Sequence, residues 1–246
     1  MKCEAVVERI IGFIREIVET SKSEGVVLGL SGGVDSAVVA FLCVRALGEK
    51  RVLANIMPEK DVTSEEDVED AILVAKMLGI EHNIIEITPF VRLFLQTLDE
   101  DKNAVINLKP RIRMTINYFY ANKLRRLVAG TGNKSEIMIG YFTKYGDGGV
   151  DFHPIGDLYK TEVFKIARFL GVPERIVRKT PTAGLYVGQT DEKEIGMSYA
   201  ELDEILMEIE KGIERKDEKF ERVLTLIKAS EHKRKLPPIP RVRDLI

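Results

Sequence analysis

The sequence has few residues of the kinds that cross-link a chain or bind it to charged surfaces. Among 246 residues there are two cysteines, three histidines and no tryptophan, and 37 lysines and arginines stand against 39 aspartates and glutamates. Two cysteines cannot form a disulfide framework, so we expect a reducing compartment. A formal net charge of −2 gives no bulk attraction to nucleic acid or to a membrane surface, and neither partner is expected.

Long apolar runs are missing as well. No segment approaches the ~20 apolar residues that a membrane-spanning helix needs, and Glu4 and Glu8 stand where a secretion signal has basic residues. Hydrophobic residues at 45% and charged residues at 31% exclude a disordered or collagen-like chain. We expect a cytoplasmic protein in which residues 1–246 form a single domain.

Helical and strand patterns alternate along the chain. Residues 3–20 have apolar positions at helical spacing, and the apolar run 26–30 does not alternate, which is typical of a strand buried on both faces. Further helices are predicted over 36–47, 64–78, 103–126, 162–170, 198–211 and 215–229, a short one after Pro89, and strands over 52–57, 83–87 and 127–130. This order predicts an α/β fold with an open, mostly parallel sheet flanked by helices, of Rossmann-like type.

The stretch 103–126 is the longest predicted helix and contains Pro110. Its apolar positions return to one face, formed by Ile112, Ile116, Phe119, Tyr120, Lys123 and Leu127 and widened by Met114, Tyr118 and Leu124. Such a face either packs into the core or covers a second subunit. The following residues 141–157 carry too many glycines for a regular element, and loops of this length are usually functional.

A phosphate-binding loop is predicted between the first strand and the next helix. It consists of Gly29, Leu30, Ser31, Gly32, Gly33, Val34, Asp35 and Ser36. Glycines let the backbone approach a phosphate, and the N–H groups that open a helix attract negative charge. The loop is neither a Walker A motif nor a dinucleotide fingerprint. Asp35 would repel phosphate unless Mg²⁺ bridged them, or else it is simply a favourable charge in the first turn of a helix.

With Ser-Gly-Gly-x-Asp-Ser at residues 31–36, the sequence resembles the ATP pyrophosphatase superfamily, which has the adenine nucleotide α hydrolase fold. The resemblance implies cleavage of ATP between its α and β phosphates. An oxygen of the substrate is adenylated, and a nitrogen or sulfur nucleophile then displaces AMP. This loop by itself does not identify the substrate.

Further motifs resemble the NAD synthetase family. They are GTGNKSE at 130–136, GYFTKYGDGGVD at 140–151, PIGDLYKT at 154–161, PTAGL at 181–185, GQTDE at 188–192 and HKR at 232–234, in family order over nearly the whole chain. The resemblance implies the last step of NAD biosynthesis, in which ammonia amidates deamido-NAD (nicotinic acid adenine dinucleotide) through an NAD-adenylate. ATP would be the co-substrate, Mg²⁺ the cofactor, and AMP and pyrophosphate the products.

The resemblance also assigns roles at the ATP site. Asp35 and Glu136 would be the Mg²⁺ ligands, and both come at the carboxyl ends of predicted strands, hence at one edge of the sheet. Thr131, Lys160 and Thr182 match positions that contact ATP, together with residues 29–36, and Lys160 would neutralise phosphate charge. Without the resemblance, Glu136 is a charge at the start of a helix and Lys160 a solvated surface residue.

Five residues match positions that hold deamido-NAD: Arg111, Lys144, Asp151, His232 and Lys233. We expect Asp151 to orient the nicotinate end and the incoming ammonia, and we group it with Asp35 and Lys160 as catalytic. Read alone, Arg111 is an exposed charge on a helix and Asp151 an acid in a glycine-rich loop. In the family the long helix packs across a two-fold axis, which implies a homodimer.

The sequence departs from the family at one ATP contact. Many bacterial members have an arginine two residues before the proline that ends the second strand; here Ile56 occupies that position, and Lys60 is a candidate replacement. The segments 59–64 and 182–194 correspond to family loops that order over the active site. We expect them to be mobile without ligand.

The expected nitrogen donor follows from length and cysteine content. Glutamine-dependent relatives add a large amidase domain with a catalytic cysteine, for which 246 residues leave no room. Cys3 falls on the first helix and Cys43 in an apolar helix, where a small buried thiol is the usual state. Free ammonia is therefore expected, unless a separate subunit supplies it.

Two rival functions use the same scaffold. A GMP-synthetase-like or tRNA-modifying member would share the ATP chemistry, but tRNA thiolation uses reactive cysteines and RNA binders have a basic face, and the sequence shows neither. A nucleotide sensor without catalysis would tolerate the loss of Asp35 or Glu136, and both are present. Pyrophosphate release that requires deamido-NAD would separate the three functions.

Overall fold

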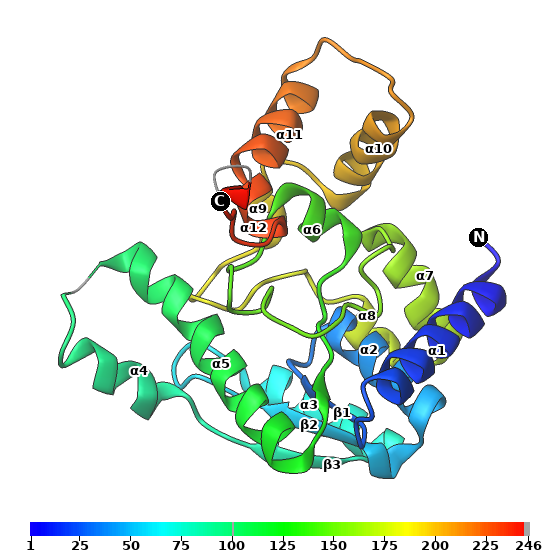
Figure 1. Cartoon of the computed structure of the whole chain (residues 1–246), viewed down its shortest axis with the longest axis vertical. Helices are drawn as coiled ribbons and strands as arrows, with labels where there is room; N and C mark the ends of the chain where they lie inside the picture. The colour runs from blue at the N-terminus through cyan, green and yellow to red at the C-terminus, as the bar shows by residue number, and fades with distance from the viewer. Residues whose placement is uncertain (100, 244–246) are drawn as a thin grey trace.

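A four-stranded parallel sheet in the order β3-β2-β1-β4 lies in the lower part of the view in Figure 1 of the computed structural model, which describes residues 1–99 and 101–243. The strands are β1 (Val26–Gly29), β2 (Val52–Ile56), β3 (Glu81–Ile84) and β4 (Leu127–Val128). Neighbouring strands are parallel throughout, with Val26 paired to both Val52 and Leu127. The predicted α/β fold with a parallel sheet is confirmed.

Helices cover both faces of the sheet. One face is covered by α2 (Val34–Leu47) and α3 (Glu65–Leu78), with α1 (Cys3–Thr20), α7 (Lys160–Leu170) and α8 (Glu174–Val177) packed beyond them; α5 (Lys102–Leu124) and α4 (Thr88–Leu95) lie on the other. A short 3₁₀ turn, Glu49–Arg51, precedes β2. None of the helices in the described part of the chain is long and apolar enough to span a bilayer.

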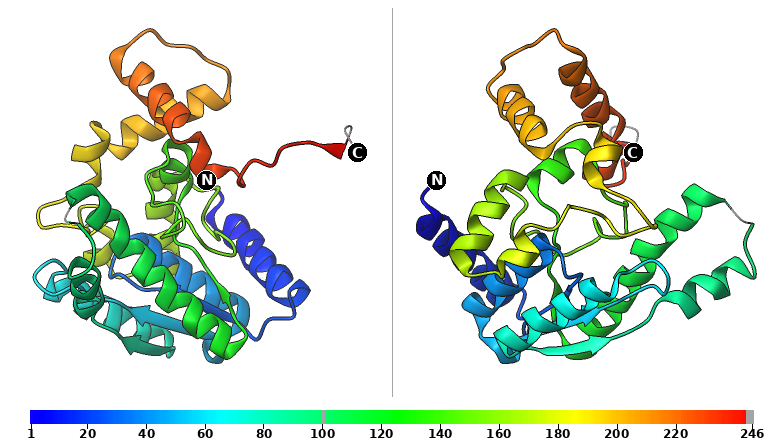
Figure 2. Two further views of the ribbon diagram at one scale, coloured as in Figure 1. Left: turned by 60° about the vertical axis from the view of Figure 1, so that its left-hand side comes forward. Right: turned by 180° about the vertical axis from the view of Figure 1, so that it is seen from behind.

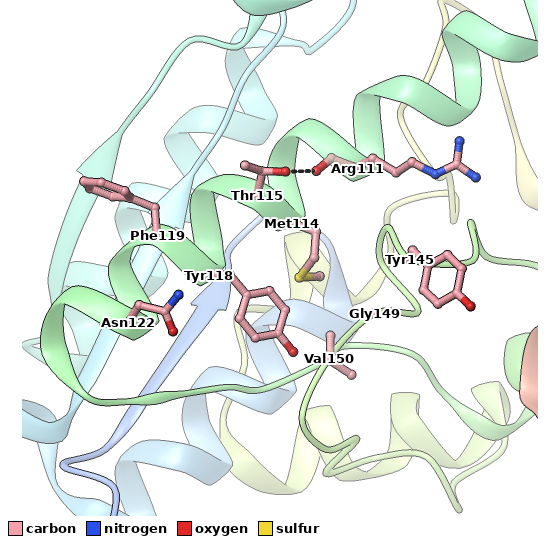
Figure 3. Close-up of a pocket in the computed structure, with 9 residues that line it drawn as sticks. All are labelled: Arg111, Met114, Thr115, Tyr118, Phe119, Asn122, Tyr145, Gly149 and Val150. Atoms are coloured by element: carbon pink, nitrogen blue, oxygen red, sulfur yellow. Dashed lines mark hydrogen bonds between the residues drawn. The ribbon is translucent and has the colours of Figure 1, made fainter. Parts of the chain in front are cut away.

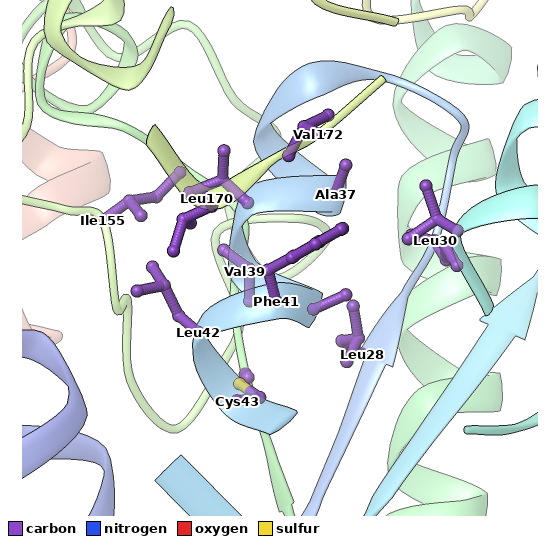
Figure 4. Close-up of a cluster of buried hydrophobic side chains, with 14 of the residues drawn as sticks. Leu28, Leu30, Ala37, Val39, Phe41, Leu42, Cys43, Ile155, Leu170 and Val172 are labelled. Carbon is purple, nitrogen blue, oxygen red and sulfur yellow. The ribbon is translucent and has the colours of Figure 1, made fainter. Parts of the chain in front are cut away.

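The strand side chains divide between two cores. Val26 and Leu28 face α1 and α2 in the larger cluster, part of which Figure 4 shows, while Val27 faces α5 and packs near Met114. Burial on both faces explains why the strand sequences do not alternate between apolar and polar residues. Helix α2 lies in the middle of the larger core and has ten buried residues among its fourteen. The phosphate-binding loop is thereby anchored between two buried elements.

The carboxyl half adds a helical lobe beside the sheet edge that carries the loop (Figure 2). The lobe contains α6 (Lys134–Ile139), α9 (Asp191–Ile195), α10 (Tyr199–Glu210), α11 (Glu218–Ala229) and α12 (Glu231–Arg234). Helices α6, α9, α10 and α11 share a separate apolar cluster that includes Ile139, Leu202 and Phe220. The packing of α10 against both α6 and α7 connects the lobe to the site described below.

Two sequence predictions were wrong in detail. The third strand covers 81–84 and not 83–87, because its register is fixed by pairing with β2; the apolar residue Ile87 is the buried N-cap residue of α4 instead. The fourth strand ends at Val128, after which Ala129 forms an isolated bridge with Phe152. Of the apolar residues predicted on one face of the long helix, Ile112 and Met114 are buried, whereas Phe119 is 63% exposed.

The face of α5 that packs into the protein is partly polar. Its buried residues are Lys109, Pro110, Ile112, Met114, Asn117 and Ala121. The Asn117 side-chain oxygen accepts a hydrogen bond from Asn55 of β2 at 3.0 Å. A satisfied polar pair of this kind is stable in a core but gives no hydrophobic signal, which is why apolar periodicity did not predict the burial of Asn117.

Candidate active site

The phosphate-binding loop is held open by its own hydrogen bonds. The Ser36 hydroxyl donates to the Gly33 carbonyl at 3.0 Å and accepts from the Ser31 N–H at 3.2 Å. Gly32 has a φ of +82°, and a Cβ built on it would lie 2.1 Å from the Asp67 carbonyl oxygen of α3. Only glycine fits there. The backbone N–H groups at the start of α2 therefore face the carboxyl edge of the sheet, as the sequence predicts.

Lys160 joins the two carboxylates that were predicted to bind metal. Its ammonium lies 2.5 Å from Asp35 Oδ2 and 3.2 Å from Glu136 Oε1, and the Lys160 side chain is only 3% exposed. The three residues come from α2, α6 and α7. Asp35 and Glu136 lie beyond the carboxyl ends of the adjacent strands β1 and β4, so the predicted juxtaposition at this sheet edge is confirmed.

Capping interactions place these side chains. Asn133 caps α6 by accepting from the Glu136 N–H at 3.0 Å, and its amide donates to Asp35 Oδ1 at 3.0 Å. At the start of α7, the Lys160 N–H donates to the Ser135 hydroxyl at 2.9 Å, and the Thr161 N–H donates to Asp203 Oδ2 at 2.8 Å. Because these capping hydrogen bonds are buried, they fix the position of the first turn of each helix.

Burial and charge together set the electrostatics. Burial raises the pKa of Glu136 to about 7, and the neighbouring carboxylates of Asp35 and Asp191 add to this while Lys160 opposes it. Burial alone would lower the pKa of Lys160, but Asp35 and Glu136 outweigh it and raise that pKa. Burial also raises the pKa of Asp191. The cluster therefore has an excess of negative charge that Lys160 alone does not balance.

The donor set fits a divalent magnesium ion. Carboxylate oxygens are the protein ligands that Mg²⁺ prefers, and it is usually held by one or two of them together with phosphate oxygens. Lys160 shows that Asp35 and Glu136 converge on a single cation. When ionised, these two carboxylates and Asp191 carry three negative charges against one positive charge on Lys160, an excess equal to the charge of one Mg²⁺.

Arg111, one of the predicted substrate residues, lines a cavity of about 840 Å³ between α5 and the loop 145–150 (Figure 3). Arg111 and Tyr118 project from α5, and Tyr145 and Val150 lie opposite them. The loop approaches α5 closely, because a Cβ on Gly146 would lie 2.9 Å from the Pro110 side chain. The size of the cavity is in the range of ligand pockets.

The structure brings together most of the residues assigned to deamido-NAD. Arg111 Nε donates to the Lys144 carbonyl at 3.3 Å, and Lys144 Nζ donates to the His232 carbonyl at 2.7 Å. Tyr118 lines the cavity, and its hydroxyl donates to Asp151 Oδ1 at 3.1 Å. The other oxygen of Asp151 accepts the Val128 N–H at 2.7 Å, so β4 holds this carboxylate in place.

Lys233 is placed differently from the other four. Its ammonium donates to the carbonyls of Gly140 and Phe142 at 2.8 Å each, and it lines a smaller cavity of about 220 Å³ together with Glu136 and Asp147. Burial lowers the pKa of Lys233. The Lys233 side chain thus closes the loop 140–142 near the cation site.

Two of the predicted ATP contacts have no partner among the other site residues. Thr131 lies between β4 and α6, and the Thr182 hydroxyl accepts only the Gly184 N–H, at 3.1 Å. Ile56 is buried in β2, so the position of the expected arginine carries no charge. Lys60 is exposed and contacts Thr88 through its backbone N–H. Its role as a replacement stays a prediction.

The segments 59–64 and 182–194, predicted to cover the site, are connected by one buried lysine. Lys109 Nζ lies 2.9 Å from Glu59 Oε2 and donates to the Leu185 carbonyl at 2.7 Å. Side chains of the lysine and the glutamate are each 9% exposed. Both segments are therefore tied to α5 in this structure. Their mobility without ligand stays a prediction.

Sequence reasoning missed four residues that shape the site: Asn133, Asp191, Tyr199 and Asp203. Asn133 and Asp191 stand inside recognised motifs, but no role was derived for them. Asn133, as a helix cap, had a readable signal in its position before the Lys-Ser-Glu start of α6. Tyr199 and Asp203 lie in an amphipathic helix and had none.

Comparisons with known proteins agree with this geometry. The family model for NAD synthase matches residues 6–237. An NH(3)-dependent NAD(+) synthetase from Archaeoglobus fulgidus is 66% identical over 100% of both chains, and one from Methanocaldococcus jannaschii is 50% identical over 97% of both.

Solved structures show the same likeness. An NMN synthetase from Francisella tularensis superposes with a TM-score of 0.89 at 37% identity, over 98% of this chain and 99% of that one. An NH3-dependent NAD synthetase from Campylobacter jejuni, in complex with the nitrate ion, gives 0.85 at 35% identity, over 98% and 100%. By the family model and by full-length relatives far above 30% identity, the chain belongs to the NAD synthase family.

Proposed function

We propose that this protein is an ATP-dependent ligase that amidates deamido-NAD with ammonia to give NAD, releasing AMP and pyrophosphate. The observation that carries the proposal is the cation cluster of Lys160, Asp35 and Glu136 beside the glycine-rich loop. The cavity lined by Arg111 is a second site, formed by α5 and the loop 145–150. One site suits a triphosphate and the other an extended anionic substrate.

The chemistry requires two activated steps. A nicotinate carboxylate is a poor electrophile, so its oxygen first attacks the α-phosphorus of ATP and pyrophosphate leaves; ammonia then attacks the acyl carbon and AMP leaves. Negative charge grows on the phosphates in the first step, and preorganised cations and N–H dipoles stabilise it. Asp35 and Glu136 would hold Mg²⁺, which when bound supplies Lewis-acid stabilisation of that charge. Lys160 would add positive charge that stabilises the same phosphates.

Asp151 is proposed to orient the nicotinate end and the incoming ammonia. Its two oxygens are fixed by Val128 and Tyr118, so the carboxylate enters the reaction with its position already set. Arg111, Lys144, His232 and Lys233 are proposed to bind deamido-NAD, Thr131 and Thr182 to contact ATP. The contacts that join Arg111, Lys144 and His232, and the size of the cavity beside Arg111, support the assignment of these three residues. The cytoplasmic location and the single domain stay predictions of the sequence.

A homodimer is also proposed. Five large apolar side chains on and near α4 and α5 are 43–63% exposed: Phe90, Leu93, Phe94, Leu98 and Phe119. Apolar residues clustered on one side of a helical pair are typical of a subunit interface, because each is stabilised by leaving water. Phe119 also lines the cavity beside Arg111, so a second copy packed on Phe119 would lie against this cavity.

The test is a reaction assay with the purified chain. NAD and pyrophosphate should form in equal amounts with ATP, Mg²⁺, deamido-NAD and ammonium chloride, and glutamine should not replace ammonium. Because a structural neighbour is an NMN synthetase, nicotinic acid mononucleotide is the competing acceptor. A higher kcat/KM for the mononucleotide, or equal rates with glutamine, would overturn the substrate or the donor part of the proposal.

A further inference from the structure

A row of buried hydroxyl groups connects Glu136 to the segment 181–195. Tyr199, at the start of α10, is 3% exposed, and its hydroxyl lies 3.2 Å from Glu136 Oε1 and 3.0 Å from Asp191 Oδ2. The Tyr141 hydroxyl lies 3.1 Å from the other oxygen, Asp191 Oδ1. None of these contacts is needed to explain the binding of ATP or of deamido-NAD.

Tyr199 contributes both its ring and its hydroxyl to the cluster. Lys160 Nζ lies 4.9 Å from the centre of the Tyr199 ring, and Asp35 and Glu136 contact the same ammonium. The Tyr199 hydroxyl lies between two acceptors, Glu136 Oε1 and Asp191 Oδ2, and it can donate its one proton to either of them.

Glu136 has a partner on each of its oxygens. Oε1 accepts from Lys160 and lies against the Tyr199 hydroxyl, and Oε2 accepts from the Asn133 N–H at 3.4 Å. The Asn133 contact is long, so the orientation of the carboxylate rests on the Oε1 side. Without the Tyr199 hydroxyl, Lys160 alone would set that side, and Lys160 also serves Asp35.

Asp191 is fixed from the backbone as well as through its side chain. It is 3% exposed, and its N–H donates to the Pro181 carbonyl at 3.0 Å, next to Thr182. A charge at this depth persists only where hydrogen bonds and an opposite charge compensate it. The two tyrosine hydroxyls supply the hydrogen bonds, and the cation cluster supplies the charge.

We propose that Tyr199 and Asp191 are positioning residues for the divalent cation site: the Tyr199 hydroxyl orients Glu136, and Asp191 holds that hydroxyl in place from its other side. The inference rests on the proposed function for its metal ion. Groups that orient a metal ligand change metal affinity by about 10–100-fold when removed.

The test measures the binding of Mn²⁺ alone and the magnesium dependence of the reaction in Tyr199→Phe and Asp191→Asn. Tyr199→Phe keeps the ring and removes only the hydroxyl. Electron paramagnetic resonance of free Mn²⁺ should show that the Kd for Mn²⁺ is raised by about tenfold or more in both variants. In the kinetic assay the KM for Mg²⁺ should rise by a similar factor, with kcat at saturating Mg²⁺ close to wild type.

Tyr159→Phe is the matched control. Tyr159 is also a buried tyrosine, but its hydroxyl donates to Glu210 at 2.5 Å, away from the cation cluster, and this variant should bind Mn²⁺ as wild type does. The inference would be overturned if Tyr199→Phe bound Mn²⁺ as tightly as wild type does, or if Tyr159→Phe lost the same amount of Mn²⁺ affinity. A wild-type protein that binds no Mn²⁺ would overturn it as well. Wild type that binds Mn²⁺ but forms no NAD would overturn the proposed function only, because the Mn²⁺ measurement still decides the positioning role.

Discussion

Replacing Gly32 with alanine should both destabilise the protein and abolish nucleotide binding. Gly32 has a φ of +82°, where an alanine costs about 1–2 kcal/mol. Its new Cβ would also lie 2.1 Å from the Asp67 carbonyl oxygen and 2.9 Å from the carbonyl carbon, so the first turn of α3 must move. Overpacking of this kind adds about 1–3 kcal/mol. The expected loss of unfolding free energy is therefore about 2–5 kcal/mol.

Gly171 provides the comparison that isolates the clash. It has nearly the same φ, +84°, at the end of α7, but a Cβ there would meet nothing within 4 Å. Gly171→Ala should thus lower the unfolding free energy by about 1–2 kcal/mol, through backbone strain alone. At about 2–4 °C per kcal/mol for a chain of this size, Gly32→Ala should melt several degrees below Gly171→Ala.

The assay is thermal unfolding with and without ATP and Mg²⁺. A ligand at 100 times its Kd stabilises by about 2.7 kcal/mol, which corresponds to a rise in Tm of about 5–10 °C. Wild type and Gly171→Ala should both show this rise, and Gly32→Ala should not, because its loop can no longer present its N–H groups to phosphate. Equal melting temperatures for the two variants, or a normal ATP response in Gly32→Ala, would refute the reasoning.

Three further predictions follow from individual side chains. Asp35→Asn should abolish NAD formation while the Tm stays within a few degrees of wild type, because Lys160 keeps Glu136 as a partner at 3.2 Å; wild-type rates would refute the metal role. Burial raises the pKa of the Cys43 thiol to about 12, so at pH 8–9 it is protonated and a thiol reagent should label only Cys3 in the native state, with two labels appearing on denaturation. Leu93→Glu, at a side chain 61% exposed, should convert the proposed dimer to monomer in light scattering without lowering the Tm of the monomer; an unchanged mass would contradict this interface.

The sequence determined the fold class and the composition of the cation cluster. Apolar runs that do not alternate with polar residues, separated by helical patterns, predict a parallel sheet of buried strands. In such a sheet the carboxyl ends of β1 and β4 lie at the same edge. That rule places Asp35 and Glu136, 101 positions apart in sequence, at one edge of the sheet, and the family resemblance assigned them as a pair. Lys160 and the deamido-NAD residues were found through motif resemblance, since a single lysine or arginine has no local signal of its role.

Only the tertiary structure decided which groups hold these residues in place. Asn117 is buried on α5 while Phe119 is exposed, because the side chain of Asn117 forms a hydrogen bond with Asn55 of β2. Local periodicity cannot predict this contact between a helix and a distant strand. Tyr199 joins Glu136 to Asp191 because α10 packs against α6 and α7, and this packing depends on residues scattered over the whole carboxyl half. Local sequence fixes local conformation and cap chemistry, whereas hydrogen bonds between distant side chains exist only once the helices have docked.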